Sequence, residues 1–343
     1  MPYKDNAVVI GGAGFIGSHL TSQLRDQGCH VTVVSRSAGA GGKEEPGIRF
    51  VKAGVADSAR IDAAIAGASV VYHLAMGGGP AWEDYQRDFI DGTLNVARAC
   101  QRHKVRRLIF TSSISALYLG RPGKLFERSG ADLKPMERGF YARGKILAEQ
   151  ALLDLHAKEN LPAVILRPGI VLGRGGMLAH GALGEAASDT CILGWGNGRS
   201  PLPCVLVQDV ARALVLAKDA PGIEGMSFNL SGDIRPTAAQ FVELLRERTK
   251  RNFRFYPRSL WAMGAMEWLR WGLKAATRNP DNVRVGNRDL QSLTMTTQLD
   301  CSEAKRMLGW NPTSDPDEFY REAIDSHLRP IPQGDLRHNS EAA

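Results

Sequence analysis

The sequence predicts an α/β fold in which helices cover both faces of a doubly wound parallel sheet, with a smaller α/β substrate-binding region completed late in the chain. Three observations support this. A glycine-rich turn joins an apolar run at residues 7–10 to a helical pattern. Strand-like and helix-like segments then alternate up to about residue 168. From residue 169, glycine and proline become frequent, which indicates a loop-rich region beside the sheet.

The glycine-rich turn is the strongest local signal. Directly after the apolar run the chain reads Gly11-Gly12-Ala13-Gly14-Phe15-Ile16-Gly17. Gly11 permits a tight exit from the strand, Gly14 lets the backbone approach a pyrophosphate, and Gly17 lets the helix lie close to the sheet. Backbone N–H groups at the helix start hold phosphates. Because a β-branched run at 31–34 completes a βαβ unit, a dinucleotide site is favoured over an ordinary tight turn.

The remaining elements follow in order along the chain. Further strands are expected at residues 48–51, 70–73, 107–110, 163–166 and 227–230. Helices are expected at 58–65, 82–103, 140–158, 209–217 and 237–250, the last capped by Thr237. We expect the sheet domain to comprise residues 1–168 and about 204–233, the substrate-binding region about 169–203 and 234–328, and a disordered tail 329–343.

Composition excludes several classes of function. The chain has 343 residues, 43% of them hydrophobic, and a net charge of +7 without a dense basic block, so nucleic-acid binding is not expected. Its five cysteines are scattered without a C-x-x-C pair, which predicts free thiols and no metal site. No run of 18 apolar residues is present, and a strand-like run begins near residue 7, so we expect no signal peptide and a cytoplasmic location.

The end of the second strand bears on the choice of cofactor. A dinucleotide fold normally has an acidic residue there, which binds the ribose hydroxyls and repels a 2′-phosphate. This chain has Ser35 followed by Arg36, a planar cation suited to phosphate. The sequence therefore predicts NADP(H) over NAD(H), with a solvated surface arginine as the alternative interpretation.

Two further segments predict chemistry. Ser112 and Ser113 follow the strand at 107–110, at the sheet edge where ligands of open α/β folds bind. Tyr141 and Lys145 are four residues apart on a predicted helix and so share a face. A nearby ammonium stabilises a phenolate, so we expect a lowered pKa for Tyr141. Tyr141 would then exchange a proton with substrate while a serine hydroxyl holds the same oxygen. The alternative is a surface tyrosine beside a solvated lysine.

These motifs together resemble the extended short-chain dehydrogenases/reductases of the NAD-dependent epimerase/dehydratase superfamily. The resemblance runs from about residue 6 to about 325 and is carried by the glycine turn, His73-Leu74-Ala75, Gly92-Thr93 with Asn95, Ser113, Tyr141, Lys145, Leu166-Arg167-Pro168-Gly169, Val207 to Ala211, and Leu299 to Trp310. It implies a Rossmann fold, a Ser113/Tyr141/Lys145 triad and cofactor contacts from the turn, Leu74, Ala75, Tyr141, Lys145 and Pro168. It also implies a homodimer built from helices at about 83–103 and 140–157. The chain departs from the family at Phe89, where an asparagine is usual, and the residue that caps the adenine is open around Asp57.

The resemblance leaves the reaction open between two branches. The segment 167–173 is more similar to 3β-hydroxysteroid dehydrogenases and dihydroflavonol reductases, which implies hydride transfer between cofactor and an apolar ketone or secondary alcohol. A nucleotide-sugar 4-epimerase or dehydratase is the alternative, because Arg199 could bind a diphosphate. A cofactor-binding scaffold without catalysis is a third interpretation, which the intact triad disfavours.

The stretch 260–276 also has several interpretations. It carries three tryptophans and two methionines, and charged residues recur at helical spacing from Glu267 to Arg278. Core packing is the first interpretation, because aromatic and methionine stripes are usually buried. A lid over an apolar substrate and an amphipathic helix on a membrane surface are the others.

Overall fold

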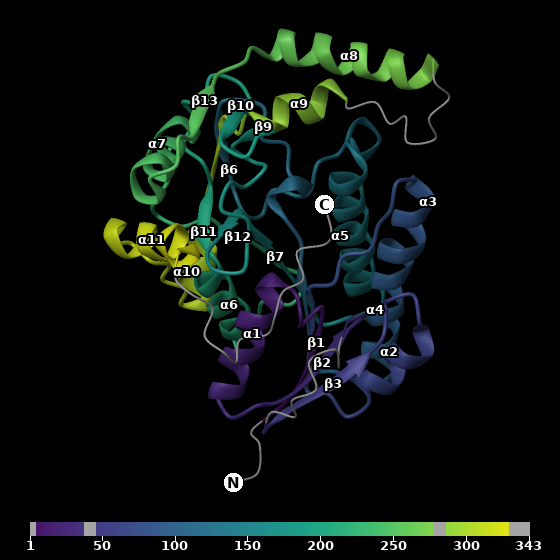
Figure 1. Cartoon of the computed structure of the whole chain (residues 1–343). Helices are drawn as coiled ribbons and strands as arrows, with labels where there is room; N and C mark the ends of the chain where they lie inside the picture. The colour runs from purple at the N-terminus through teal and green to yellow at the C-terminus, as the bar shows by residue number, and fades with distance from the viewer. Residues whose placement is uncertain (1–4, 38–45, 277–285, 329–343) are drawn as a thin grey trace.

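A seven-stranded parallel sheet forms the centre of the molecule (Figure 1). The computed structural model describes residues 5–37, 46–276 and 286–328. The sheet strands are β1 (Asn6–Ile10), β2 (His30–Ser35), β3 (Ile48–Lys52), β4 (Val70–His73), β5 (Arg107–Thr111), β7 (Ala163–Pro168) and β12 (Ser227–Leu230). Their order is β12-β7-β5-β4-β1-β2-β3, and every neighbouring pair is parallel. The order reverses between β1 and β4, so the predicted doubly wound sheet is confirmed and its switch point lies there.

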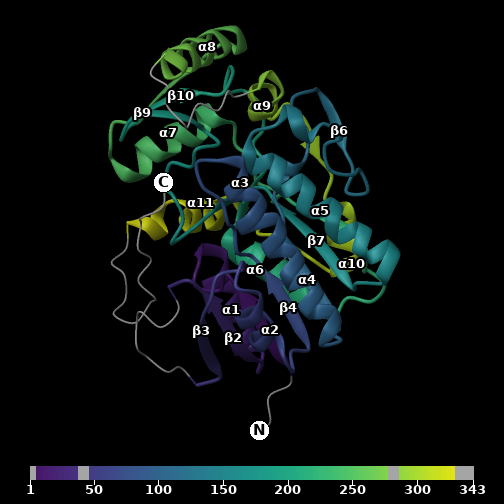
Figure 2. The same ribbon diagram turned by 90° about the vertical axis from the view of Figure 1, so that its right-hand side faces the viewer.

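Helices cover both faces of this sheet (Figure 2). Helices α1 (Phe15–Asp26) and α6 (Val207–Leu216) pack together on one face. Helices α2 (Ser58–Ile65), α4 (Gly92–Arg102) and α5 (Phe140–Glu159) pack side by side on the other. The strands supply both cores because their side chains alternate: Val9 packs with Leu20 and Leu24 of α1, whereas Val8 and Ile10 pack with the opposite helices.

The helix predicted at residues 82–103 differs from the structure in its middle. It consists of α3 (Trp82–Tyr85), a π-helical segment η1 (Gln86–Asp91) and α4. Such wider turns often occur at functional sites. Here the π segment contains Phe89, whose side chain is buried and packs against the ammonium group of Lys145 at 4.8 Å from the ring centroid.

The later part of the chain builds small sheets at the edge of the main one. A pair is formed by β8 (Ile170–Leu172) and β11 (Cys204–Leu206), another by β6 (Gly123–Leu125) and β14 (Thr297–Leu299), and a three-stranded sheet by β9 (Gly184–Ser188), β10 (Cys191–Gly194) and β13 (Arg254–Tyr256). The helices are α7 (Ala238–Thr249), α8 (Leu260–Ala276), α9 (Asn287–Leu293), α10 (Ser302–Leu308) and α11 (Pro316–Ala323). The predicted cap is confirmed, since Thr237 Oγ1 accepts from the N–H of Gln240 at 3.2 Å. The stretch 169–203, expected to be mostly loop, contains β8, β9 and β10, and the predicted tail 329–343 lies outside the described residues.

Two observations on the described residues concern the wider setting. No helix among them is long and apolar enough to cross a membrane. None of the five cysteines forms a disulfide, and Cys29, Cys100, Cys204 and Cys301 are buried. Burial in apolar surroundings raises the pKa of the Cys204 thiol to about 12, so this thiol is protonated at neutral pH.

Candidate active site

The glycine turn has the geometry that a bound pyrophosphate needs. Gly11 has φ +85°, and a Cβ there would lie 2.7 Å from the backbone nitrogen of Ala75. A Cβ on Gly17 would lie 2.2 Å from the carbonyl oxygen of Gly11, so only glycine lets α1 start this close to the strand. A Cβ on Gly14 would meet only the Gly11 oxygen, at 3.2 Å, which leaves the outer side of the turn open. The three glycines therefore keep the backbone bare where a phosphate would approach.

The start of α1 is suited to an anion. Its N-cap is Gly14, without a side-chain cap, and its first turn contains no acidic residue. The first-turn N–H groups of Phe15, Ile16 and Gly17 have no carbonyl partner inside the helix, and the helix dipole favours negative charge there. Leu74 and Ala75 lie alongside, because both of their N–H groups bond to Ile10 O, at 2.8 and 3.0 Å. These residues fit the diphosphate of a dinucleotide.

The end of β2 lies beside this cradle. The N–H of Gly11 donates to Val34 O at 2.8 Å, which joins the turn to the last residues of β2. The Arg36 side chain is exposed and crosses Gly54, where a Cβ would lie 3.8 Å from its Cγ. The hydroxyls of Ser35 and Ser37 are 3.2 Å apart. Ser35, Arg36 and Ser37 therefore lie at the end of β2, where dinucleotide folds bind the adenosine ribose, while Asp57 accepts the N–H of Arg60 and caps α2.

Tyr141 lies at the first turn of α5, at the same edge of the sheet. Its phenol lies near the hydroxyl of Ser113, just beyond the end of β5, close enough for that hydroxyl to lower the pKa of Tyr141. Ser113 Oγ also accepts the N–H of Ser115 at 3.1 Å, which fixes the hydroxyl in place. The neighbouring Ser112 hydroxyl is buried and has no hydrogen-bond partner among the described residues. Of the two predicted serines, Ser113 is thus the one placed next to the phenol.

The expected lowering of the Tyr141 pKa is wrong for the protein without cofactor. Although Tyr141 as a residue is 36% exposed, loss of water around its phenol raises its pKa, the neighbouring Ser113 hydroxyl acts in the opposite direction, and the nearby Tyr85 raises the pKa further. The ammonium of Lys145 is directed elsewhere: its Nζ donates to Thr111 O at 2.9 Å and lies 5.1 Å from the centroid of Phe110. Tyr141 is therefore a protonated phenol at neutral pH.

Lys145 itself is strongly perturbed. Burial lowers its pKa to about 7, while the charge of Glu149 acts in the opposite direction. Phe89 occupies the position where an asparagine was expected, and its ring faces the ammonium at 4.8 Å. A cation–π contact thus lies where related chains usually have an asparagine.

Pro168 completes the set of predicted residues, at the carboxyl end of β7. The preceding Arg167 is fully buried and bonds to both carboxylate oxygens of Glu149 through Nε, at 3.0 and 3.1 Å. The following Gly169 lies against Pro203, whose oxygen would be 1.9 Å from a Cβ there. This close contact and the ion pair fix the strand end on both sides. Because all sheet strands are parallel, the ends of β1, β2, β4, β5 and β7 bring the predicted residues to one edge.

Comparison with known proteins agrees with this geometry. The model of the NAD dependent epimerase/dehydratase family matches residues 7–231, more than half of the chain. The chain belongs to this family. Membership implies a nicotinamide dinucleotide cofactor, and the cradle described above fits one.

Relatives within the family include oxidoreductases. A 2-alkyl-3-oxoalkanoate reductase of Stenotrophomonas maltophilia is 31% identical over 62% of this chain and 65% of its own length. A decarboxylating sterol-4-alpha-carboxylate 3-dehydrogenase of Mus musculus is 28% identical over 66% of this chain and 63% of its own length. The matched region thus spans less than two thirds of either relative. A solved UDP-glucuronic acid 4-epimerase from Bacillus cereus, in complex with UDP-glucuronic acid and NAD, superposes with a TM-score of 0.71 at 20% identity, covering 94% of this chain and 98% of that one, which shows the shared fold.

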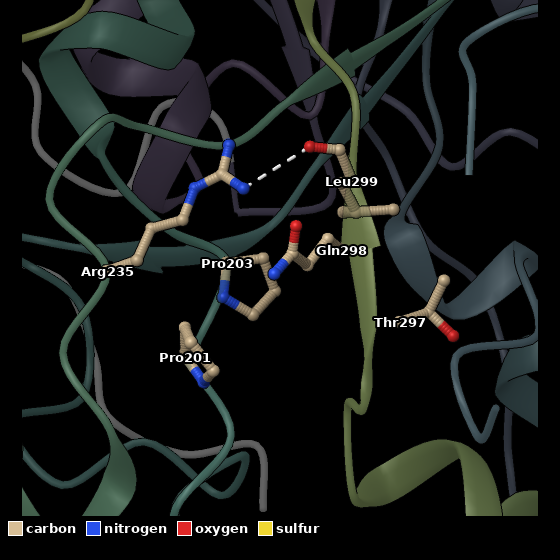
Figure 3. A pocket seen from close by; sticks show the side chains of 6 residues that line it. All are labelled: Pro201, Pro203, Arg235, Thr297, Gln298 and Leu299. Carbon is tan, nitrogen blue, oxygen red and sulfur yellow. Dashed lines mark hydrogen bonds between the residues drawn. The ribbon is translucent and has the colours of Figure 1, made fainter. Parts of the chain in front are cut away.

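A cavity of about 270 Å³ lies between strand β14 and the segments that carry Pro201, Pro203 and Arg235 (Figure 3). It is lined by Pro201, Pro203, Arg235, Thr297, Gln298 and Leu299. Arg235 Nη1 donates to Leu299 O at 3.3 Å across it. None of the predicted catalytic or cofactor-binding residues lines this cavity, so we do not assign it to the reaction.

An aromatic cluster beside Tyr141 was not predicted. The rings of Trp82, Tyr85 and Phe140 have centroids 5.7 to 6.4 Å apart, and the guanidinium of Arg143 lies 3.5 Å from the centroid of Trp82. Helical spacing would have indicated each pair, since Trp82 and Tyr85, like Phe140 and Arg143, are three residues apart. The cluster forms one wall next to the phenol.

A buried ionic network, also not predicted, connects the two catalytic segments. Arg138 Nε donates to Asp289 of α9 at 2.6 Å, and its Nη1 donates to Asp132 at 2.8 Å. Its Nη2 donates to Ser115 O at 3.1 Å, two residues beyond Ser113. Asp289 also accepts the N–H of Gly139, two residues before Tyr141. No local sequence signal indicates this network, because α9 lies about 150 positions away in the chain.

Proposed function

We propose that this protein is an NADP(H)-dependent oxidoreductase that transfers hydride between the nicotinamide and a ketone or secondary alcohol, with Tyr141 as the acid/base. The observation that carries the proposal is the placement of Tyr141 and Ser113 at the same sheet edge as the glycine cradle. A cofactor bound in that cradle would supply or accept hydride next to the phenol. The reductase and dehydrogenase relatives support redox chemistry over a binding function.

In this proposal each residue of the chain has a defined task. Ser113 holds the carbonyl oxygen of the substrate, and Tyr141 gives that oxygen its proton as the carbonyl carbon accepts hydride. In the reverse direction the phenolate accepts the proton of the alcohol. The raised pKa of Tyr141 keeps the phenol protonated at neutral pH, which is the form that the reductive step uses. Lys145 and Pro168 position the nicotinamide half of the cofactor.

The choice of NADP(H) rests on Arg36. A guanidinium at the end of β2 attracts a 2′-phosphate, and Ser35 there replaces the carboxylate that would repel it. Arg36 is exposed, and its charge already acts on Asp88, whose pKa it lowers, so its guanidinium supplies positive potential at this edge. We also propose a fairly apolar substrate, because the two relatives are named for alkyl and sterol substrates.

The test is NADPH consumption by the purified protein with a panel of hydrophobic 3-oxo acids and ketones, beside a panel of UDP-sugars. The proposal expects stoichiometric oxidation of NADPH with at least one ketone, faster than with NADH. Tyr141→Phe should abolish turnover while NADPH still binds. The enhancement of NADPH fluorescence on titration with the protein measures this binding. Sugar interconversion without net oxidation would instead establish the epimerase alternative. Equal activity of wild type and Tyr141→Phe would refute the assigned role.

A further inference from the structure

Helix α8 is oriented in an unusual way. It has 17 residues, of which only Met263 is buried, so the core-packing interpretation is wrong. With 3.6 residues per turn, one face of the helix is formed by Trp261, Ala265, Trp268, Leu269, Gly272 and Ala276. All six are exposed, and Trp261 and Leu269 keep 82% and 65% of their surface in solvent. This outer face contains no charged residue.

The charged side of α8 is turned toward the protein instead. Arg270 forms ion pairs with Glu267 at 3.0 Å and with Glu185 of β9 at 2.5 Å. Arg258, just before the helix, binds the other oxygen of Glu185 at 3.1 Å. A surface helix of a globular protein usually has the opposite orientation. Its apolar residues face the core and its charged residues face solvent. The ion pairs therefore hold α8 with its apolar face outward.

We propose that the outer face of α8 docks onto an anionic lipid surface, with the helix lying in the plane of the headgroups. The helix is about 25 Å long at ~1.5 Å per residue, and Figures 1 and 2 show it at the outer end of the small-sheet region. An apolar face bearing tryptophan is typical of helices that lie in a membrane interface.

Charge and area favour lipid over a second copy of the chain. Lys250, Arg251 and Arg254 are exposed in the segment that leads into α8, and the whole chain carries +7, which complements anionic headgroups. A stable protein interface uses about 20 to 30 residues on each side. The outer face offers six residues, three of them alanine or glycine, which is too few for a dimer but enough to insert among headgroups.

The test is flotation of the purified full-length protein with two kinds of vesicle, pure phosphatidylcholine and phosphatidylcholine with about 30% phosphatidylglycerol. We expect co-flotation with the anionic vesicles, and a loss of about tenfold in the bound fraction for Trp261→Ser/Leu269→Ser. Lys250→Glu/Arg254→Glu should weaken binding to anionic vesicles. The matched control is Leu133→Ser, which removes an apolar side chain that is 88% exposed but lies far from α8 in the chain.

The outcomes separate the alternatives. Brominated lipid should quench the tryptophan fluorescence of the wild type more than that of the double variant. Melting temperatures should match, because both substituted residues are exposed, and a match shows that the variant is folded. Absence of flotation with anionic vesicles, or equal flotation of wild type and double variant, would overturn the proposal. If the wild type and the control variant form a concentration-dependent dimer, the double variant stays monomeric, and none of them binds vesicles, the face belongs to a second copy.

Discussion

Replacing Arg138 with methionine tests whether the buried network positions the catalytic residues. The Arg138 side chain is only 3% exposed and Asp132 only 1%. Besides both aspartates, its guanidinium donates to Leu117 O at 3.0 Å, Ser115 O at 3.1 Å and Ser292 Oγ at 3.3 Å. Methionine keeps much of the side-chain stem but removes every donor. Two carbonyl groups then lose this donor and Asp289 loses its cationic partner, keeping the N–H of Gly139, while Asp132 retains Arg288.

The expected cost follows from this burial. Removing one partner of a buried ion pair costs about 3–5 kcal/mol, because a charge is left without compensation. The matched control is Arg87→Met, since the Arg87 side chain is 61% exposed although it also pairs with two aspartates, Asp84 and Asp88. Solvent screens such a pair, so its loss should cost about 0–1 kcal/mol.

Urea denaturation and steady-state kinetics measure the two effects. We expect Arg138→Met to lower the free energy of unfolding by several kcal/mol more than Arg87→Met does. We also expect kcat to fall about 10- to 100-fold with little change in the Kd for NADPH, because Ser115 and Gly139 each lie two residues from a catalytic side chain. A loss of stability below about 1 kcal/mol, or a kcat equal to that of the control, would refute the reasoning.

Four further predictions concern single residues. Tyr141→Phe should reduce turnover by about 100-fold or more without weakening NADPH binding, measured by rapid kinetics and fluorescence titration. Arg36→Ala should weaken NADPH binding by about 10- to 100-fold and leave NADH unchanged; an equal effect on both cofactors would contradict the assignment. Gly17→Ala should abolish dinucleotide binding, because the new methyl group meets Gly11 O, whereas Gly264→Ala, with open space around it, should be tolerated. The pKa of Lys145 falls from 10.5 to about 7 on folding, so between these pH values the unfolded chain binds more protons than the folded protein. The free energy of unfolding should therefore rise with pH, by at most about 1.4 kcal/mol per pH unit. A Lys145→Met variant with the same slope would exclude this cause.

The sequence was sufficient for the part of the site that local geometry controls. Positive φ at Gly11 and close packing at Gly17 admit only glycine, so the pattern itself identifies the turn. Parallel strands place their carboxyl ends at one edge, so the strand ends near Leu74 and Ser113 were predicted together. The direction of the Tyr141 pKa shift could not be obtained this way. It depends on how far the phenol is buried and on where the Lys145 ammonium points, and both are results of packing.

The sequence by itself determined the doubly wound sheet, its glycine turn and the shared helix face of a tyrosine and a lysine, because periodicity, chain reversal at glycine and helical spacing act over a few residues. Only the tertiary structure decided what lies around that pair. Arg138 reaches Asp289 across 151 positions. Helix α8 shows the same limit. The sequence predicts its amphipathic pattern, but the ion pair of Arg270 with Glu185, 85 positions away, decides which side faces outward. Contacts over such separations form only when the whole chain packs, so no short stretch of sequence contains them.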